Sequence, residues 1–208
     1  MILNKERRRL YVEKSKKPFY KKFWVWIIAI IIIGGVIGSN GSKKTGNTSN
    51  NSSTKKEDKK EDTRKITYEK FSKVKMGSTY EDVKNMLGEG KESTSSEMGG
   101  IKTVIYTWDN GDGSNMNVTF QNNKALAKAQ AGLSRERADV NMEKYNKIQT
   151  GMDYNKIKEI LGDEELMSIS EVGGSNTSIY SWVNSNGTNM NVTFQDGKST
   201  AKAQFGLK

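Results

Sequence analysis

The seven residues 115–121 recur unchanged as residues 189–195. The offset of 74 residues holds without a gap when residues 71–133 are aligned with residues 145–207, and about 30 of the 63 aligned positions are identical. Ungapped self-similarity at a fixed spacing indicates a tandem duplication. The folded part is therefore predicted to contain two copies of one unit of about 65 residues. Because units of this size are only marginally stable alone, the copies are expected to pack together.

The net charge of +10 is unevenly distributed. Residues 1–22 hold nine Lys or Arg against two Glu, and residues 39–65 hold eight basic against four acidic residues. Residues 66–208 hold 17 basic and 18 acidic side chains. A nearly neutral repeat region lacks the basic surface that neutralises phosphates, so no nucleic acid is expected among the partners.

The chain contains neither Cys nor His. This excludes disulfides, thiol nucleophiles, Ser-His-Asp triads and His or Cys metal sites. The acidic residues fall on predicted helix surfaces, caps and turns, with no convergent acid and base. Asp109, Asp112 and the neighbouring Asn also suit a calcium loop, but the loop is short and lacks the downstream bidentate acid. We therefore predict a protein that is not an enzyme and has no cofactor or metal.

The N-terminal part is predicted to anchor the chain in a membrane. A basic arm at residues 1–22 precedes an uncharged, apolar run at residues 23–42. The positive-inside rule puts the arm in the cytoplasm and the repeats outside the cell. The prediction is a single-pass cell-membrane protein with a signal anchor. A signal peptide cleaved near Gly38 is the alternative.

Residues 43–66 are polar and charged, so they cannot bury enough surface to offset the entropy of ordering. This segment is predicted to be a disordered linker. The alternative is a mixed-charge segment that binds cell-wall polymer.

Each repeat, at residues 67–134 and 142–208, is predicted to be an α+β unit of two short helices on a four-stranded antiparallel sheet. In the first copy the strands are expected at residues 91–98, 102–109, 115–121 and 125–133. The cap of the second helix is expected from Ser78 or Thr79 in the first copy, where Ser78 and Glu81 have capping-box spacing, and from Asp153 in the second copy. Gly88 and Gly162 are expected to end these helices in the left-handed conformation.

The repeated heptapeptide alternates strictly between apolar and polar residues. Met116, Val118 and Phe120 point to one face of the strand and are expected to meet the helices. Asn115, Asn117, Thr119 and Gln121 point to the other face, which is then open. Two such sheets are expected side by side as one broad surface. The polar side chains are either a partner-binding surface or ladders exposed to solvent.

Three motifs occur in both copies: Phe71-x-x-Val74-x-x-Gly77-x-x-Tyr80-x-x-Val83-x-x-x-Leu87-Gly88, then Val118-Thr119-Phe120, then Lys128-Ala129-Gln130-x-Gly132-Leu133. With them the chain resembles the tandem-repeat β-lactamase inhibitor proteins over residues 68–207. It is also similar to the BamE-like outer-membrane lipoproteins. Its layout is most like that of membrane-anchored Gram-positive surface proteins of this superfamily.

The resemblance implies a concave sheet that grips an enzyme with aromatic side chains while an acidic loop enters the active site. In this chain the gripping positions hold Asn115, Asn117, Asn191 and Thr193. The inserted acid is replaced by Gly113, next to Asp112. The candidate partner-binding residues are Asp109, Asp112, Asn115, Asn117, Thr119, Asn191, Thr193 and Phe205.

Three functions remain open at this level. The leading one is a protein-binding module that docks a protein of the cell envelope. The second is an inhibitor of β-lactamases or transpeptidases, and the third is a structural or wall-polymer-binding element. Two aromatic pairs, Tyr106 with Trp108 and Tyr180 with Trp182, are either core or ligand-binding residues.

Overall fold

The structure is a computed structural model that describes residues 64–208. The first repeat contains α2 (Tyr68–Lys73), α3 (Tyr80–Leu87), β1 (Lys91–Met98), β2 (Ile101–Asp109), β3 (Asn115–Gln121) and β4 (Lys124–Ala131). The second repeat contains α4 (Met142–Lys147), α5 (Tyr154–Leu161), β5 (Glu165–Val172), β6 (Ser175–Val183), β7 (Asn189–Gln195) and β8 (Lys198–Phe205). The predicted α+β unit of two helices and a four-stranded antiparallel sheet is confirmed in both copies.

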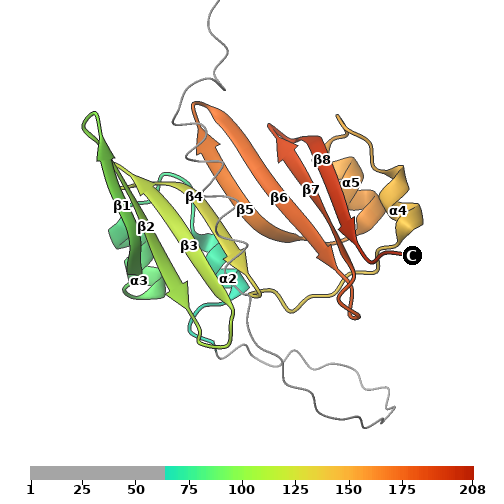
Figure 1. Cartoon of the computed structure of the whole chain (residues 1–208), viewed down its shortest axis with the longest axis horizontal. Helices are drawn as coiled ribbons and strands as arrows, with labels where there is room; N and C mark the ends of the chain where they lie inside the picture. Colours follow the sequence, from blue (N-terminus) through green and yellow to red (C-terminus); the bar gives the residue numbers. More distant parts are fainter. Residues whose placement is uncertain (1–63) are drawn as a thin grey trace, which may run out of the picture.

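All eight strands form one antiparallel sheet in sequence order, from β1 at one edge to β8 at the other (Figure 1). The expectation that the two sheets lie side by side is confirmed, because β4 and β5 pair directly. The predicted basic arm and membrane anchor, and most of the predicted linker, lie outside the described residues. Within residues 64–208, no helix has the length and apolar character needed to cross a membrane.

Two-residue turns set the register of the β3–β4 and β7–β8 hairpins. Asn122 and Asn123 join β3 to β4 with positive φ angles of 46° and 62°. Two consecutive positive φ angles make the turn whose twist matches that of paired strands, and Asn tolerates this conformation better than most residues. Asp196 and Gly197 form the same turn between β7 and β8. The heptapeptide strands therefore hold equivalent positions in both repeats.

The helix caps differ in detail from the predicted ones. Thr79, one of the two expected caps, does cap α3, but its capping box pairs it with Asp82 rather than pairing Ser78 with Glu81. Asp153 precedes α5 but makes no cap hydrogen bond, because its carboxylate accepts from the Lys198 ammonium at 2.7 Å. Gly88 has the expected positive φ of 81°, but its ψ of −176° is extended rather than left-handed helical.

Each repeat has its own hydrophobic core between the helices and one face of the sheet. In the first repeat, Met116, Val118 and Phe120 are at most 2% exposed, and they pack with Phe71 and Val83 of the helices. The second core repeats this arrangement around the following residues: Met190, Val192, Phe194, Ile157 and Leu161. The predicted direction of the heptapeptide side chains is confirmed.

A short junction joins the repeats. Three residue pairs link β4 to β5: Ala127 with Ser170, Lys128 with Ile169, and Ala129 with Ser168. The Gln130 side-chain amide donates to Glu165 Oε1 at 2.6 Å and to the Leu166 carbonyl at 3.1 Å. The Leu166 amide in turn donates to the Tyr68 hydroxyl at 2.6 Å. Side chains of the first repeat therefore form hydrogen bonds with β5, the first strand of the second repeat.

A lysine on the core face of β4 caps the first helix. The Lys128 ammonium donates to the carbonyls of Phe71 at 2.8 Å and Val74 at 2.7 Å, and it lies 4.5 Å from the centre of the Phe71 ring. Lys202 does the same in the second repeat, donating to the Tyr145 carbonyl at 2.7 Å. A cation at a helix C-terminus satisfies carbonyls that have no partner within the helix.

The first repeat begins earlier than predicted. Ile66, placed in the linker from sequence, is fully buried, and its amide donates to the Asn110 side chain at 2.9 Å. The Arg64 guanidinium donates to the carbonyls of Gly132 and Leu133. The structure therefore assigns residues 64–66 to the folded unit rather than to the linker, because Ile66 is part of its core and Arg64 is bonded to the residues that follow β4.

Candidate functional site

The sheet face opposite the helices, here called the open face, carries mostly small and polar side chains. Helices of both repeats lie on one side of the sheet, and no helix of residues 64–208 covers the other (Figure 1). Strand pairing defines one row across this face: Thr107, Asn117, Ala129, Ser168, Ile179, Thr193 and Ala201. The candidates Asn117 and Thr193 therefore belong to one continuous row that spans both repeats.

The remaining open-face candidates fall into two separate groups. Asn115, Asn117 and Thr119 lie on β3, whereas Asn191 and Thr193 lie on β7. Four strand spacings separate β3 from β7, which is about 19 Å at the usual spacing. A ligand that touches both groups must therefore be a macromolecule rather than a small molecule.

Small residues fill the space between the two groups. Ala127, Ala129, Ser168 and Ser170 meet at the junction of β4 and β5. Thr119, beside this strip, is only 3% exposed, and within the described residues its hydroxyl has no hydrogen-bond partner. The middle of the open face at the β4–β5 junction therefore carries only short side chains.

Phe205 is the most exposed aromatic side chain of the open face, at 71%. It ends β8 and pairs with Asn189 across the last rung of the sheet. Its counterpart in the first repeat is Ala131, which pairs with Asn115. The second repeat therefore offers an apolar anchor at a position where the first has only a methyl group.

The acidic candidates occupy the loop between β2 and β3. The Asp112 carboxylate accepts hydrogen bonds from the amide and the hydroxyl of Ser114, and it lies 4.0 Å from the Arg64 guanidinium. These hydrogen bonds, foremost that from the Ser114 hydroxyl, lower the pKa of Asp112. The Asp109 carboxylate accepts from the Gly111 amide. Both acids therefore shape the loop that presents them.

The loop between β6 and β7 has the same shape without the charge. Asn186 takes the place of Asp112, and its side-chain oxygen accepts from the amide and hydroxyl of Thr188 at 3.0 and 2.7 Å. The side chain of Asn184 bonds the Val140 backbone just as that of Asn110 bonds Ile66. The two loops therefore differ in charge rather than in conformation, and only the first carries acids.

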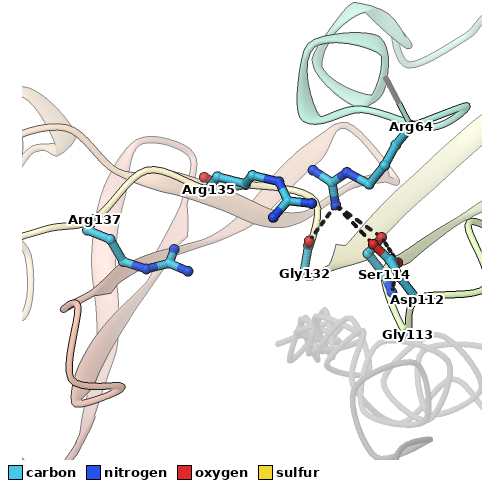
Figure 2. Close-up of a pocket in the computed structure, with 8 residues that line it drawn as sticks. Arg64, Asp112, Gly113, Ser114, Gly132, Arg135 and Arg137 are labelled. Atoms are coloured by element: carbon cyan, nitrogen blue, oxygen red, sulfur yellow. Dashed lines mark hydrogen bonds and ion pairs between the residues drawn. The ribbon is translucent and has the colours of Figure 1, made fainter. Parts of the chain in front are cut away.

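A pocket of about 390 Å³ lies where the first loop meets the connection between the repeats (Figure 2). It is lined by Arg64, Asp112, Gly113, Ser114, Gly132, Ser134, Arg135 and Arg137. All three arginines of residues 64–208 therefore gather at one place. Arg64 is bonded to Ser114 and Gly132, whereas Arg135 and Arg137 are exposed. Guanidinium groups pair readily with carboxylates, so this pocket suits an acidic group of a partner.

Sequence reasoning missed this pocket. Arg64 falls in the predicted linker at residues 43–66, and Arg135 and Arg137 fall between the two predicted repeats, where no binding residue is expected. The signal lay in residue choice, because the rest of residues 64–208 uses lysine for every other positive charge. Among these residues, no cluster of acidic side chains has the arrangement needed to hold a metal ion.

The two aromatic pairs belong to the cores. Trp108 is 3% exposed and donates from its indole nitrogen to the Gly88 carbonyl at 2.9 Å. Trp182 makes the equivalent bond to Gly162 at 3.1 Å. Tyr106 stacks on Tyr80 with ring centres 4.0 Å apart. Of the two interpretations kept open for these aromatics, the structure supports a role in the core.

The comparisons with known proteins agree with this architecture. The model of the Beta-lactamase inhibitor (BLIP) family matches residues 67–182, which cover the first repeat, the junction, and the second repeat as far as β6. This is more than half of the chain, and the chain belongs to this family. The predicted likeness to the tandem-repeat β-lactamase inhibitor proteins is thereby confirmed, while the likeness to BamE-like lipoproteins stays a prediction.

A similar solved structure is that of a candidate beta-lactamase inhibitor protein from Streptococcus mutans. It is 25% identical in sequence, with a TM-score of 0.57. The alignment covers 66% of this chain and 94% of that chain. A search of curated proteins found no match.

Proposed function

We propose that this chain is a non-enzymatic protein-binding module, anchored in the cell membrane by residues 23–42, that docks a protein of the cell envelope. The observation that carries the proposal is the continuous open face. It spans eight strands, has both helical layers on its opposite side, and ends next to the hairpin loops and the arginine pocket. Membership of a family of inhibitor proteins supports recognition of a protein rather than a small molecule.

The chemistry of the open face favours a polar partner surface. Asn117 and Asn191 present amides that both donate and accept hydrogen bonds. Large aromatics and Arg supply most of the energy of tight interfaces, and here Phe205 and the three arginines are the residues of that kind. We therefore place the anchors of binding at the margins of the open face and the selective polar contacts along its rows.

Site-specific crosslinking tests this proposal. A photo-reactive residue at position 117 or 191 of the full chain, expressed in membranes, is expected to capture one discrete protein. Position 85 is the matched control, because Asn85 is an exposed Asn on α3, on the helical side of the sheet. Equal capture from all three positions, or none from positions 117 and 191, would contradict docking through the open face.

Inhibition of a β-lactamase is the second candidate, favoured by the family match and by the description of the similar structure. In that case the loop between β2 and β3, with Asp112 beside Gly113, enters the enzyme's active site. Steady-state assays against class A β-lactamases and transpeptidases are expected to show inhibition that is lost in an Asn117→Lys variant and kept in Asn85→Lys. If the β-lactamases and transpeptidases keep their full activity at high micromolar concentrations of this chain, this candidate is eliminated.

A further inference from the structure

The edge of the sheet at β8 shares part of its sequence with β4, which pairs with β5 in the same molecule. β8 is the counterpart of β4 at the offset of 74 residues, and residues 201–204 are identical to residues 127–130. β4 pairs with β3 on one side and β5 on the other, whereas β8 pairs only with β7 among the described strands. The first residues of β8, Lys198 and Ser199, are bonded to the loop at residues 151–153, so the unpaired part of the edge lies beyond Ser199. The chain therefore contains its own example of a strand bound at this edge.

The glutamine at this edge is held in the same way with and without a neighbouring strand. The Leu133 amide donates to Gln130 Oε1 at 3.1 Å, and the Leu207 amide donates to Gln204 Oε1 at 3.1 Å. The other end of the Gln130 amide donates to Glu165 and Leu166 of β5. Within residues 64–208, the corresponding nitrogen of Gln204 has no acceptor, so it is oriented to donate to an incoming strand.

Lys202, the core-facing lysine of β8, makes the same contacts as Lys128 of β4. Lys202 donates to the Tyr145 carbonyl and lies 4.1 Å from the centre of that ring, just as Lys128 sits on Phe71. Met142 stands where the first repeat has Tyr68, the residue that meets Leu166. The edge therefore offers a fixed lysine and an apolar thioether beside it.

Solvent exposure shows the difference that a bound strand makes. Gln130 is 3% exposed and Ala127 is 9% exposed, whereas Gln204 and Ala201 are exposed to solvent. An accessible edge strand invites pairing unless charges, Pro or bulges protect it. β8 has no bulge at residues 201–204, and its lysine there is turned to the core.

We propose that the β8 edge is a docking site for an extended segment of a partner protein, which adds a ninth antiparallel strand. The β4–β5 junction specifies the chemistry of that segment. The partner segment is expected to carry a carboxylate that accepts from Gln204, followed directly by an aliphatic residue. A second aliphatic residue lies opposite Lys202, with a small residue on either side of it. Glu165, Leu166, Ile169, Ser168 and Ser170 fill these places at the internal junction. This site is separate from the open face and stands independently of the proposed function.

A second copy of the chain fits the edge less well. β1 is the counterpart of β5, but it has Lys91 in place of Glu165 and Glu92 in place of Leu166. Lys91 cannot accept from Gln204, and Glu92 would bring a charge where the junction has an aliphatic side chain. Two β8 strands paired antiparallel about Lys202 would set one Lys202 against another, and like charges directly opposite destabilise a sheet.

Peptide binding to the full chain in detergent micelles tests this inference. The probe is a labelled peptide with the sequence of residues 165–172, and its matched control has the sequence of residues 91–98. Fluorescence anisotropy is expected to show binding of the first peptide only. Hydrogen exchange is expected to slow at β8 amides when the peptide is added. No binding at millimolar peptide would overturn the proposal. Slower hydrogen exchange at β4 amides alone would also overturn it, because it would mean that the peptide displaces β5 from β4.

Changing the charge at position 204 of the chain and at the first position of the peptide tests whether these two residues are in contact. Gln204→Glu keeps the acceptor for the Leu207 amide but sets a carboxylate against the peptide glutamate, so affinity is expected to fall about tenfold or more. A peptide with Lys in place of that first Glu is expected to recover affinity for the variant. Because the peptide change leaves the protein untouched, a folding defect cannot imitate this recovery. Equal affinity of both peptides for both proteins, or formation of a dimer through β8, would overturn the assignment.

Discussion

The side-chain amide of Gln130 donates a 2.6 Å hydrogen bond to Glu165 Oε1, and this bond crosses the boundary between the two repeats. Gln130 is buried, so its contacts are protected from competition by water. Only three backbone residue pairs join β4 to β5, compared with seven between β3 and β4. The side chains at this short junction therefore contribute much of what holds two small units in one sheet.

Replacing the two equivalent glutamines should have unequal effects. Gln130→Ala removes the bonds to Glu165 and Leu166 and leaves the buried Leu133 amide without a partner. We expect the free energy of unfolding to fall by about 1–3 kcal/mol. Gln204→Ala loses only the bond from the Leu207 amide at an exposed edge, and should cost less than about 1 kcal/mol. Urea unfolding measures both, and equal losses would contradict a special role of the junction.

Lys128 should make stability depend on pH on the alkaline side. Burial lowers the pKa of Lys128 from 10.5 to about 8. Between these values the unfolded chain binds more protons than the folded one, so stability is expected to rise as pH increases above 8. The slope is at most about 1.4 kcal/mol per pH unit. The bonds from the ammonium to the carbonyls of Phe71 and Val74 favour the charged form and reduce this gain.

The comparison between the native chain and Lys128→Met isolates this effect. Burial raises the pKa of Tyr68, Tyr106 and Tyr180, and these groups make stability fall above about pH 10 in both proteins. Urea unfolding at pH 7.5, 8.5 and 9.5 is therefore compared between the two. A steeper rise in the native chain is the expected result. Parallel curves would mean that Lys128 keeps its ordinary pKa.

Gly90→Ala should destabilise the first repeat through a direct clash. A Cβ atom at Gly90 would lie 2.6 Å from Cζ2 and 2.8 Å from Cε2 of the Trp108 ring. That ring is buried and fixed by its bond to Gly88, so it cannot move aside without disturbing the core. Overpacking of this kind costs about 1–3 kcal/mol. Thermal unfolding with Trp fluorescence measures the loss. The second repeat has Glu164 at the matching position, so the clash is specific to the first repeat, and a neutral Gly90→Ala would contradict it.

The sequence was sufficient to predict the local architecture because each strand has its own signals. The heptapeptide alternates apolar and polar residues between two turns, and β1 and β3 have the predicted bounds. The 74-residue duplication required two similar units. These patterns depend on neighbours in sequence, and the register of the β3–β4 and β7–β8 hairpins follows from their two-residue turns.

Contacts between distant residues were beyond the reach of the sequence. The junction depends on Tyr68 meeting Leu166, 98 positions later, and on Gln130 meeting Glu165. Lys128 belongs to a residue type that is usually exposed, and only the helix above it explains its burial. The candidates Asn117 and Asn191 were placed on the correct face, but the arginine pocket needs Arg64 and Gly132 to be adjacent in space.

Asp112→Asn should preserve the first hairpin loop, because Asn186 already holds the equivalent loop of the second repeat with the same two hydrogen bonds. The native Asp112 has a lowered pKa, so it stabilises the fold above its unfolded pKa of 3.8, and this contribution is lost as pH falls through the lowered value. We expect Asp112→Asn to keep the amide chemical shift of Ser114 near its native position and to make that shift independent of pH between 5 and 2. Asp109→Asn is the control, because Asp109 contacts Gly111 rather than Ser114. A pH-dependent Ser114 signal that survives in Asp112→Asn would show that another acid shapes this loop.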